Sequence, residues 1–224
     1  MINKFVLTDD GSSSIYSEDV KEFYHSRFGA LQESMHIFIN AGLCYEKLSH
    51  LKHISVLEIG FGTGLNAWLT YYKAQELQKK VYYETLELYP LSLEEIDSLN
   101  YPSILQYEDG KEIFHALHRS KWNEIQQITD NFILHKRQIS TIHATYLSNT
   151  FNLVYFDAFS PEVQPDMWTR DMFESIYCSM KNGSILLTYC TKGIVRKTVT
   201  AVGFVIEKLP GPIGKREILR AIKV

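Results

Sequence analysis

Glycines and one acidic residue make up the most informative motif of the chain. Residues 54–59 are mostly apolar, with Glu58 near their end, and Gly60, Gly62 and Gly64 follow at alternate positions. Glycine adopts unusual backbone dihedrals and lets a ligand approach the main chain closely. A strand that turns so sharply into a helix predicts a site for a nucleoside-containing cofactor. The spacing differs from the dinucleotide fingerprint G-x-G-x-x-G, and a tight turn that binds nothing is the alternative.

A second acidic residue, Glu87, follows the next predicted strand at residues 81–86. In doubly wound sheets, a carboxylate at this place accepts hydrogen bonds from ribose hydroxyls in the crevice outside the strand ends. Glu87 is therefore the second expected contact of a nucleoside. The alternative is an exposed carboxylate at the end of a strand.

A third carboxylate, Asp157, ends an apolar run at residues 151–156 and is followed by Phe159 and Pro161. An alkylamine is largely protonated at neutral pH, so a transfer to its nitrogen requires that a proton leave. A carboxylate within hydrogen-bonding distance can orient the amine and take that proton. We expect Asp157 to be the catalytic group and Phe159 to stack on a flat base or exclude water. A simple cap of the following turn is the other reading of Asp157.

Alternating strands and helices surround these residues and predict an α/β sheet with helices on both faces. We expect helices over residues 34–51 and 65–79, a mainly helical stretch over 91–130, a helix that ends near Gly183, and a basic helix over 192–202. Expected strands cover residues 54–59, 81–86, 131–136, 151–157, 184–190, 204–209 and 217–224. About 30 residues at the N-terminus differ from the rest and predict a small β-rich extension with short strands near Phe5 and Ile15. We expect one domain over residues 1–224.

The net charge of −3 by itself disfavours a nucleic-acid partner. The distribution of the charge along the chain is more informative. Residues 181–224 contain nine Lys or Arg against two Glu, a net +7, so the first 180 residues carry −10. Such asymmetry indicates a polyanion on the C-terminal part, with solvated helix and strand faces as the alternative.

The three cysteines are widely separated and lack metal-ligand spacing, so we expect no metal. No stretch approaches the roughly 18 apolar residues that span a bilayer, and the first residues have no apolar core of a secretory signal. Cytoplasmic residence, with reduced thiols and no membrane partner, is the expectation.

Several motifs together resemble one family. The spacing from Glu58 to Gly64 is similar to that of S-adenosylmethionine-dependent methyltransferases. Asp157-Ala158-Phe159-Ser160-Pro161, followed by Pro165-Asp166-Met167-Trp168, resembles the signature of the tRNA 5-methylaminomethyl-2-thiouridine methyltransferases. Further matches lie at residues 24–43, 188–191, 195–197, 203–204 and 214–217, so the resemblance covers most of the chain.

This resemblance implies a class I, Rossmann-like methyltransferase fold and a methyl transfer from S-adenosyl-L-methionine. The acceptor would be the 5-aminomethyl group of a wobble (2-thio)uridine in tRNA, and the product 5-methylaminomethyl. The matched positions expected to hold the donor are Glu58, Gly60, Gly62, Gly64, Asn66 and Glu87. Asp157 would engage the amine, and Phe159 or Trp168 would stack on the wobble base. The basic residues expected at the phosphates of the anticodon stem-loop are Lys192, Arg196, Lys197, Lys215 and Arg216.

Two features depart from the family. Members are often fused to a flavin-dependent oxidase that generates the amine, and the sequence shows no such half, so a separate enzyme is expected to supply the aminomethyl group. Methyltransferases commonly carry an acidic residue after the third strand for adenine. Residues 135–140 contain no acidic residue, so the backbone or Gln138 is expected to contact the adenine instead.

Three other functions remain open from the sequence. One is an N-methyltransferase of a small amine, which needs no basic face. Another is a flavin- or nicotinamide-linked oxidoreductase acting on a CH–NH group, which the glycine spacing disfavours. The third is an RNA-binding module that holds the donor without catalysis.

Overall fold

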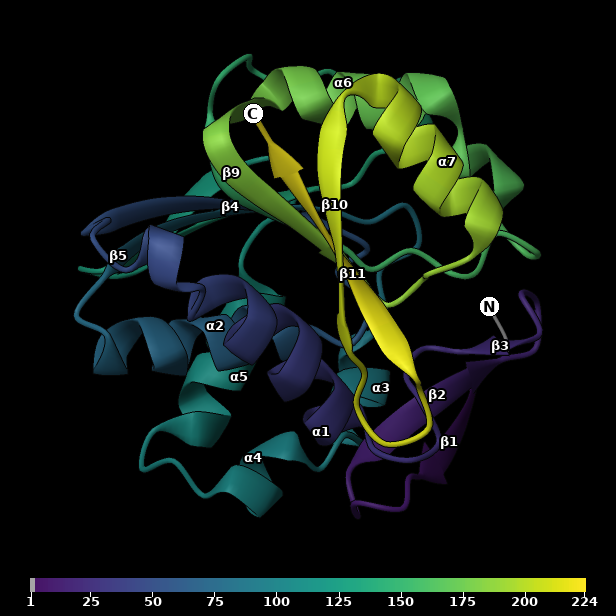
Figure 1. Ribbon diagram of the computed structural model, residues 1–224. Helices are drawn as coiled ribbons and strands as arrows, with labels where there is room; N and C mark the ends of the chain where they lie inside the picture. Colours follow the sequence, from purple (N-terminus) through teal and green to yellow (C-terminus); the bar gives the residue numbers. More distant parts are fainter. Residues whose placement is uncertain (1–2) are drawn as a thin grey trace.

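The computed structural model describes residues 3–224 and has an eight-stranded mixed sheet at its centre (Figure 1). The strand order is β10-β11-β9-β8-β4-β5-β7-β6. In chain order the strands are β4 (His53–Ile59), β5 (Lys80–Leu86), β6 (Ile125–Thr129), β7 (Phe132–Arg137), β8 (Phe151–Phe156), β9 (Met180–Thr188), β10 (Phe204–Pro210) and β11 (Glu217–Lys223). The strands β7, β5, β4, β8 and β9 are mutually parallel, and β6 and β11 run antiparallel to their neighbours. This confirms the α/β prediction.

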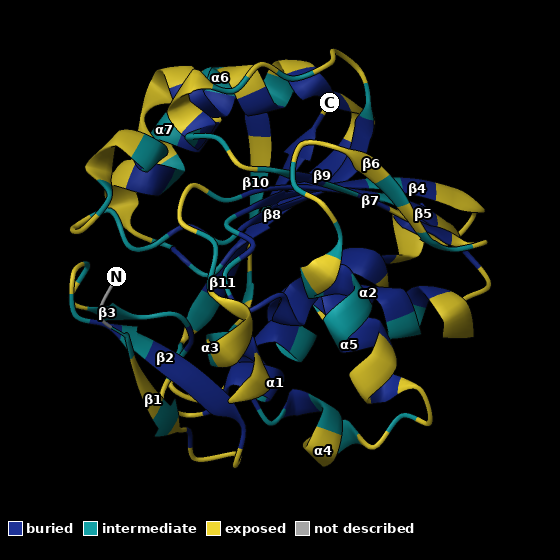
Figure 2. Cartoon of the chain, turned by 180° about the vertical axis from the view of Figure 1, so that it is seen from behind, coloured by how far each residue is buried: buried dark blue, intermediate teal, exposed yellow. Residues whose placement is uncertain are grey.

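Helices cover both faces of the sheet (Figure 1). One face carries α1 (Ala30–Ser34), a π-helix (Met35–Leu43), α2 (Leu65–Glu76), α3 (Leu93–Asp97), α4 (Tyr101–Leu105) and α5 (Gly110–Arg119); the other carries α6 (Arg170–Ser179) and α7 (Gly193–Val202). Each face has its own apolar core, the first around Trp68 and Tyr83 and the second around Phe156 and Phe173. The inner strands are buried from both sides (Figure 2), as parallel strands between helical layers must be.

A separate three-stranded antiparallel sheet precedes the main one. It contains β1 (Asn3–Leu7), β2 (Ser13–Ser17) and β3 (Glu22–Phe23). Phe5 pairs with Ile15, as the sequence predicts for two short strands. The Asn100 side chain accepts a hydrogen bond from the Ser13 amide at 2.7 Å, which ties this sheet to α4. Met1 and Ile2, which the expected extension includes, lie outside the described residues.

Three expectations about local structure are wrong. Residues 125–129 are not helical but form β6, an edge strand whose polar side chains hide its periodicity. Residues 34–51 contain no continuous α-helix: they form the π-helix and a 3₁₀ turn at Glu46–Leu48, and the Cys44 amide bonds to the Ile39 carbonyl five residues back. The helix expected to end near Gly183 ends at Ser179, and Gly183, with φ +76°, lies within β9 where its register with β8 shifts.

Two further 3₁₀ turns, at Thr141–His143 and Pro165–Trp168, complete the fold. No helix among the described residues is long and apolar enough to cross a membrane.

Candidate active site

The glycine turn connects β4 to α2 at the carboxyl edge of the sheet. Gly60, Gly62 and Gly64 have φ angles of +91°, +48° and +71°, in the left-handed region that favours glycine. A Cβ on Gly60 would lie 2.9 Å from the main-chain oxygen of Asp157, so the turn passes directly against the end of β8. The close approach of β4 and β8 thus requires glycine, and it brings the turn and Asp157 to the same place.

A cavity of about 640 Å³ opens beside this turn. Seven of the predicted site residues line it: Gly60, Gly62, Asn66, Glu87, Asp157, Phe159 and Lys215. They come from the ends of β4, β5 and β8, from the first turn of α2, and from the loop between β10 and β11. Parallel strands bring their carboxyl ends to one edge, which explains why residues so distant in sequence meet there.

The Glu87 carboxylate is held at the cavity wall by main-chain amides. One oxygen accepts a hydrogen bond from the Gly62 amide at 3.2 Å and the other from the Tyr89 amide at 2.9 Å. Burial raises the pKa of Glu87, and these backbone hydrogen bonds oppose the rise. Each carboxylate oxygen has further lone pairs, so Glu87 can also accept hydrogen bonds from a ligand.

The Asp157 carboxylate accepts a hydrogen bond from the side-chain amide of Asn66 at 2.8 Å. Burial and the negative charge of Glu33 raise the pKa of Asp157 to about 7, while Asn66 and Lys215 act in the opposite direction. A carboxyl group with this proton affinity exchanges a proton near neutral pH, which is what a general base needs.

Glu58 and Gly64 do not line the cavity in the described structure. The Glu58 side chain is fully buried beneath the turn, where the Thr85 hydroxyl donates to it at 2.8 Å. Burial raises its pKa well above the usual range. Gly64 caps the start of α2, and a Cβ there would meet the ring of His118. Both residues therefore shape the turn from below, and direct donor contacts by them remain predictions.

The predicted basic residues are scattered. Lys192 forms an ion pair with Glu162, Arg196 is half-buried on α7, and Arg216 is exposed; none of the three lines the cavity described here. Lys215 lies inside it, with its ammonium 3.3 Å from a Glu33 oxygen. Trp168 is buried, and its indole donates to the Phe159 carbonyl at 2.9 Å, so it supports Phe159 from the core.

The wall also contains residues that were not among the predicted site residues. Residues 19–20 and 22–27, together with Glu33 and Tyr189, also line the cavity. The mixture of aromatic and polar residues after Tyr24 was a signal for the first group. The ring of Tyr24 packs edge-on against Phe159, with centroids 5.1 Å apart. Glu33 lies in α1 and Tyr189 follows β9; both belong to segments that resemble the family, but the fold is needed to place them at the cavity.

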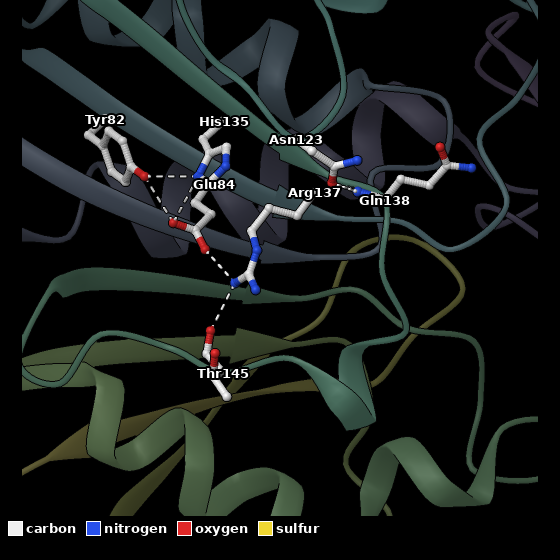
Figure 3. A network of polar contacts seen from close by, with 7 residues as sticks. All are labelled: Tyr82, Glu84, Asn123, His135, Arg137, Gln138 and Thr145. Atoms are coloured by element: carbon white, nitrogen blue, oxygen red, sulfur yellow. Dashed lines mark hydrogen bonds and ion pairs between the residues drawn. The ribbon is translucent and has the colours of Figure 1, made fainter.

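Gln138 does not line the cavity, whereas Ser140 and Thr141 do. The main-chain amide of Gln138 donates a hydrogen bond to the side-chain oxygen of Asn123 at 3.0 Å. Figure 3 shows how the following loop is anchored: the Arg137 guanidinium donates to Glu84 and to the Thr145 carbonyl, both at 3.0 Å. Glu84 also accepts a hydrogen bond from Tyr82. This partly buried network anchors the loop that carries Ser140 and Thr141.

No group of three or more His, Cys, Asp or Glu within residues 3–224 is arranged to hold a metal ion. The polar side chains of the cavity include carboxylates, Lys215, Arg27, His25 and several hydroxyls.

Comparison with known proteins agrees with this geometry. Residues 117–224 match a family described as S-adenosyl-L-methionine-dependent methyltransferase. The tRNA 5-methylaminomethyl-2-thiouridine biosynthesis bifunctional protein MnmC of Leptospira interrogans is 29% identical over 96% of the chain and 34% of its own length. The protein of the same name from Nitrosospira multiformis is 25% identical over 96% of the chain and 36% of its length. The chain thus spans about a third of these relatives.

Solved structures show the same fold. The crystal structure of MnmC2 from Aquifex aeolicus superposes with a TM-score of 0.80 over 99% of the chain and 70% of that protein, at 24% identity. Spermidine synthase from Thermotoga maritima gives a TM-score of 0.57 at 11% identity, over 100% of the chain and 80% of that protein. The solved structure confirms the predicted class I fold, and residues 117–224, which include Asp157, match the family described as S-adenosyl-L-methionine-dependent methyltransferase.

Proposed function

We propose that this protein transfers a methyl group from S-adenosyl-L-methionine to the 5-aminomethyl group of a wobble (2-thio)uridine in tRNA, giving 5-methylaminomethyl. The observation that carries this proposal is the position of Asp157, which lines the same cavity as the glycine turn and is oriented by Asn66 at 2.8 Å. The names of the relatives, which place them in 5-methylaminomethyl-2-thiouridine biosynthesis, support the choice of acceptor.

The residues around the turn fit the donor. Glycine at positions 60 and 62 leaves the main chain without side chains, so a ligand can approach it closely. A Cβ on Gly62 would lie 3.0 Å from the Tyr24 ring. Glu87 presents a carboxylate to the cavity between two main-chain amides, as ribose hydroxyls require. The cavity of about 640 Å³ lies within the usual range for cofactor sites. We assign donor binding to the glycine turn, Asn66 and Glu87, with Ser140 and Thr141 on the adenine side.

S-adenosyl-L-methionine, when bound, supplies a methyl group on a sulfonium, whose sulfur keeps the electron pair of the broken carbon–sulfur bond. The protein must present the amine with a free lone pair in line with that bond. Asp157 accepts the proton that the amine loses, and Asn66 holds the carboxylate in place. Phe159 and Tyr24 form an aromatic wall that excludes water and offers a face for the uridine ring.

The RNA would lie on the C-terminal part, where the positive charge is concentrated. Arg216 is exposed and Lys192 is about half exposed, and both are proposed to contact phosphates together with Arg196. Phosphate contacts release counterions, so binding that depends on them weakens as salt rises. Loss of one such residue should reduce the slope of log affinity against log salt concentration by about one.

Three further statements belong to the same proposal. A separate enzyme supplies the aminomethyl group, the reaction takes place in the cytoplasm, and residues 1–224 act as one methyltransferase domain with the first 30 or so as an extension. The anchoring of β2 to α4 through Asn100 supports the single domain.

A small amine as the acceptor is the main rival, and one comparison separates the two. The protein would be assayed with labelled donor and either the free 5-aminomethyl nucleoside or tRNA that carries the same 5-aminomethyl group at its wobble uridine. We expect efficient transfer only to the tRNA, and substitution of Arg216 by Ala should raise KM for tRNA without affecting donor binding. Equal transfer to the free nucleoside would favour the rival, and an oxidised product without methyl transfer would favour an oxidoreductase.

A further inference from the structure

A partly buried ion pair joins two distant parts of the chain at the cavity. The side chain of Glu33, at the end of α1, is 10% exposed, and that of Lys215, in the loop between β10 and β11, is 27% exposed. Their charged atoms are 3.3 Å apart. The other Glu33 oxygen accepts a hydrogen bond from the Ser26 amide at 2.7 Å. Both ends of the pair are thus held by the protein and line the cavity that contains Asp157.

The pair belongs to a continuous wall that ends beside Asp157. The Lys215 ammonium lies 4.8 Å from the centre of the Tyr189 ring, and the Tyr189 hydroxyl donates to the Ala158 carbonyl at 3.0 Å. The loop is also packed against the N-terminal segment, because a Cβ on Gly214 would overlap the ring of Phe28. Four segments far apart in sequence therefore meet on the acceptor side of the cavity.

Few charged groups act on Asp157. Those that shift its pKa are Glu33 from α1, Asn66 from α2 and Lys215 from the β10–β11 loop. Asp157 in turn raises the pKa of Glu58 on β4, Tyr83 on β5 and Tyr189 after β9. Glu58 is fully buried beneath the turn. Glu33 and Lys215 are thus the two oppositely charged side chains that line the cavity with Asp157 and act on it.

We propose that the Glu33–Lys215 ion pair is a positioning element for amine methylation: it holds the β10–β11 loop against α1 and balances the charge beside Asp157, so that this carboxylate can take a proton from a primary amine near neutral pH. The inference rests on the proposed function, because amine methylation is the reaction in which the pair would act. Neither side chain of the pair has to touch the reacting atoms, since each is already bound by the other.

The two charges act in opposite senses, which gives a signed test. Glu33→Gln removes a negative charge and should lower the midpoint of the acid limb of kcat/KM by about one pH unit. Lys215→Met leaves Glu33 unpaired and should raise that midpoint by about the same amount. The double variant should return close to the wild-type midpoint. Gln at position 33 retains a carbonyl for the Ser26 amide, so the backbone contact survives.

Two control variants separate this role from simple loss of structure. Lys215→Arg keeps the charge and should keep the wild-type midpoint. Lys208→Met breaks a surface ion pair with Glu217 on the same hairpin, and should leave the midpoint unchanged. A structural defect would lower the rate at every pH, whereas the proposed role moves the midpoint in opposite directions in the two single variants.

The direction of each midpoint shift can also be measured without substrate. The titration of the Asp157 carboxyl carbon would be followed by NMR in the wild type and the variants. Opposite shifts in the two single variants would support the inference. Unchanged midpoints, or shifts in the same direction, would overturn it. Failure of the wild type to methylate tRNA would defeat the proposed function instead, and the NMR titration would still decide whether the pair controls Asp157.

Discussion

The side-chain amide of Asn66 donates a hydrogen bond to the Asp157 carboxylate at 2.8 Å and so connects the first turn of α2 with the end of β8. Asn66 lies two residues after Gly64 of the glycine turn, whereas Asp157 directly follows β8 and is the proposed contact of the acceptor. The contact fixes the distance between the two halves of the site. Because positioning supplies most of the rate in a methyl transfer, this hydrogen bond is a central part of the proposed mechanism.

Replacement of Asp157 by Asn should lower methyl transfer by roughly 100- to 10,000-fold, the usual contribution of a general base. The amide retains an oxygen for the Asn66 hydrogen bond, so the fold and donor affinity should remain close to those of the wild type. Calorimetry of donor binding and initial rates with tRNA would check both statements. Wild-type rates in this variant would remove Asp157 from catalysis, and a donor-binding module without activity would tolerate the change.

The rate should depend on pH through Asp157. Its pKa is raised to about 7, and only the ionised carboxylate can take a proton, so kcat/KM should fall as pH decreases through about 7. A pH profile with a donor concentration far above its Kd would show this acid limb. The limb should be absent from the residual activity of Asp157→Asn.

The same pKa predicts that Asp157 weakens the fold at neutral pH. A carboxyl group raised from 3.8 to about 7 binds its proton more tightly in the folded state than in the unfolded state. The stabilisation by that proton is complete below pH 3.8 and is lost as pH rises to about 7. Asp157→Asn should therefore increase the free energy of unfolding at pH 8 by about 1 kcal/mol or more. Urea titrations at pH 8 and pH 5 would test this, with a larger gain expected at pH 8.

Replacement of Glu87 by Ala should weaken donor binding by about 10- to 100-fold, because hydrogen bonds to a charged group contribute about 1.5–3 kcal/mol. It also removes the acceptor for the Gly62 amide, which loosens the turn itself. Glu94→Ala is a matched control, since Glu94 has the same charge, is exposed on α3 and does not line the cavity. Donor affinity equal to that of the control would remove Glu87 from the site.

Replacement of Gly60 by Ala should cost more than left-handed strain alone. The strain at φ +91° is worth about 1–2 kcal/mol, and the new Cβ must also push the end of β8 away. Gly183→Ala provides the comparison, because φ is +76° there and no atom lies within 4 Å of the added Cβ. We expect both variants to lose stability in thermal unfolding, and only Gly60→Ala to lose donor binding and activity.

The sequence predicted those parts of the site that follow from strand ends. Gly60, Glu87 and Asp157 each come directly after an apolar run, and the parallel arrangement of such strands then brings them together. The wall formed by Glu33, Tyr189 and Lys215 does not follow from strand ends, and Lys215 was predicted as a phosphate contact rather than as part of this wall. Its contacts depend on how α1 and the β10–β11 loop pack in three dimensions, and no local pattern encodes that. The edge strand β6 was missed for a related reason: with one side in solvent, it lacks an apolar period.

The central claim is tested most directly by the product. Purified protein would be incubated with methyl-labelled S-adenosyl-L-methionine and tRNA that carries the unmethylated 5-aminomethyl group at its wobble uridine, and the tRNA would then be digested to nucleosides. We expect the label in a 5-methylaminomethyl uridine derivative at the wobble position, and none with Asp157→Asn. Label at another nucleoside, label in a small amine, or no transfer to tRNA would contradict the account.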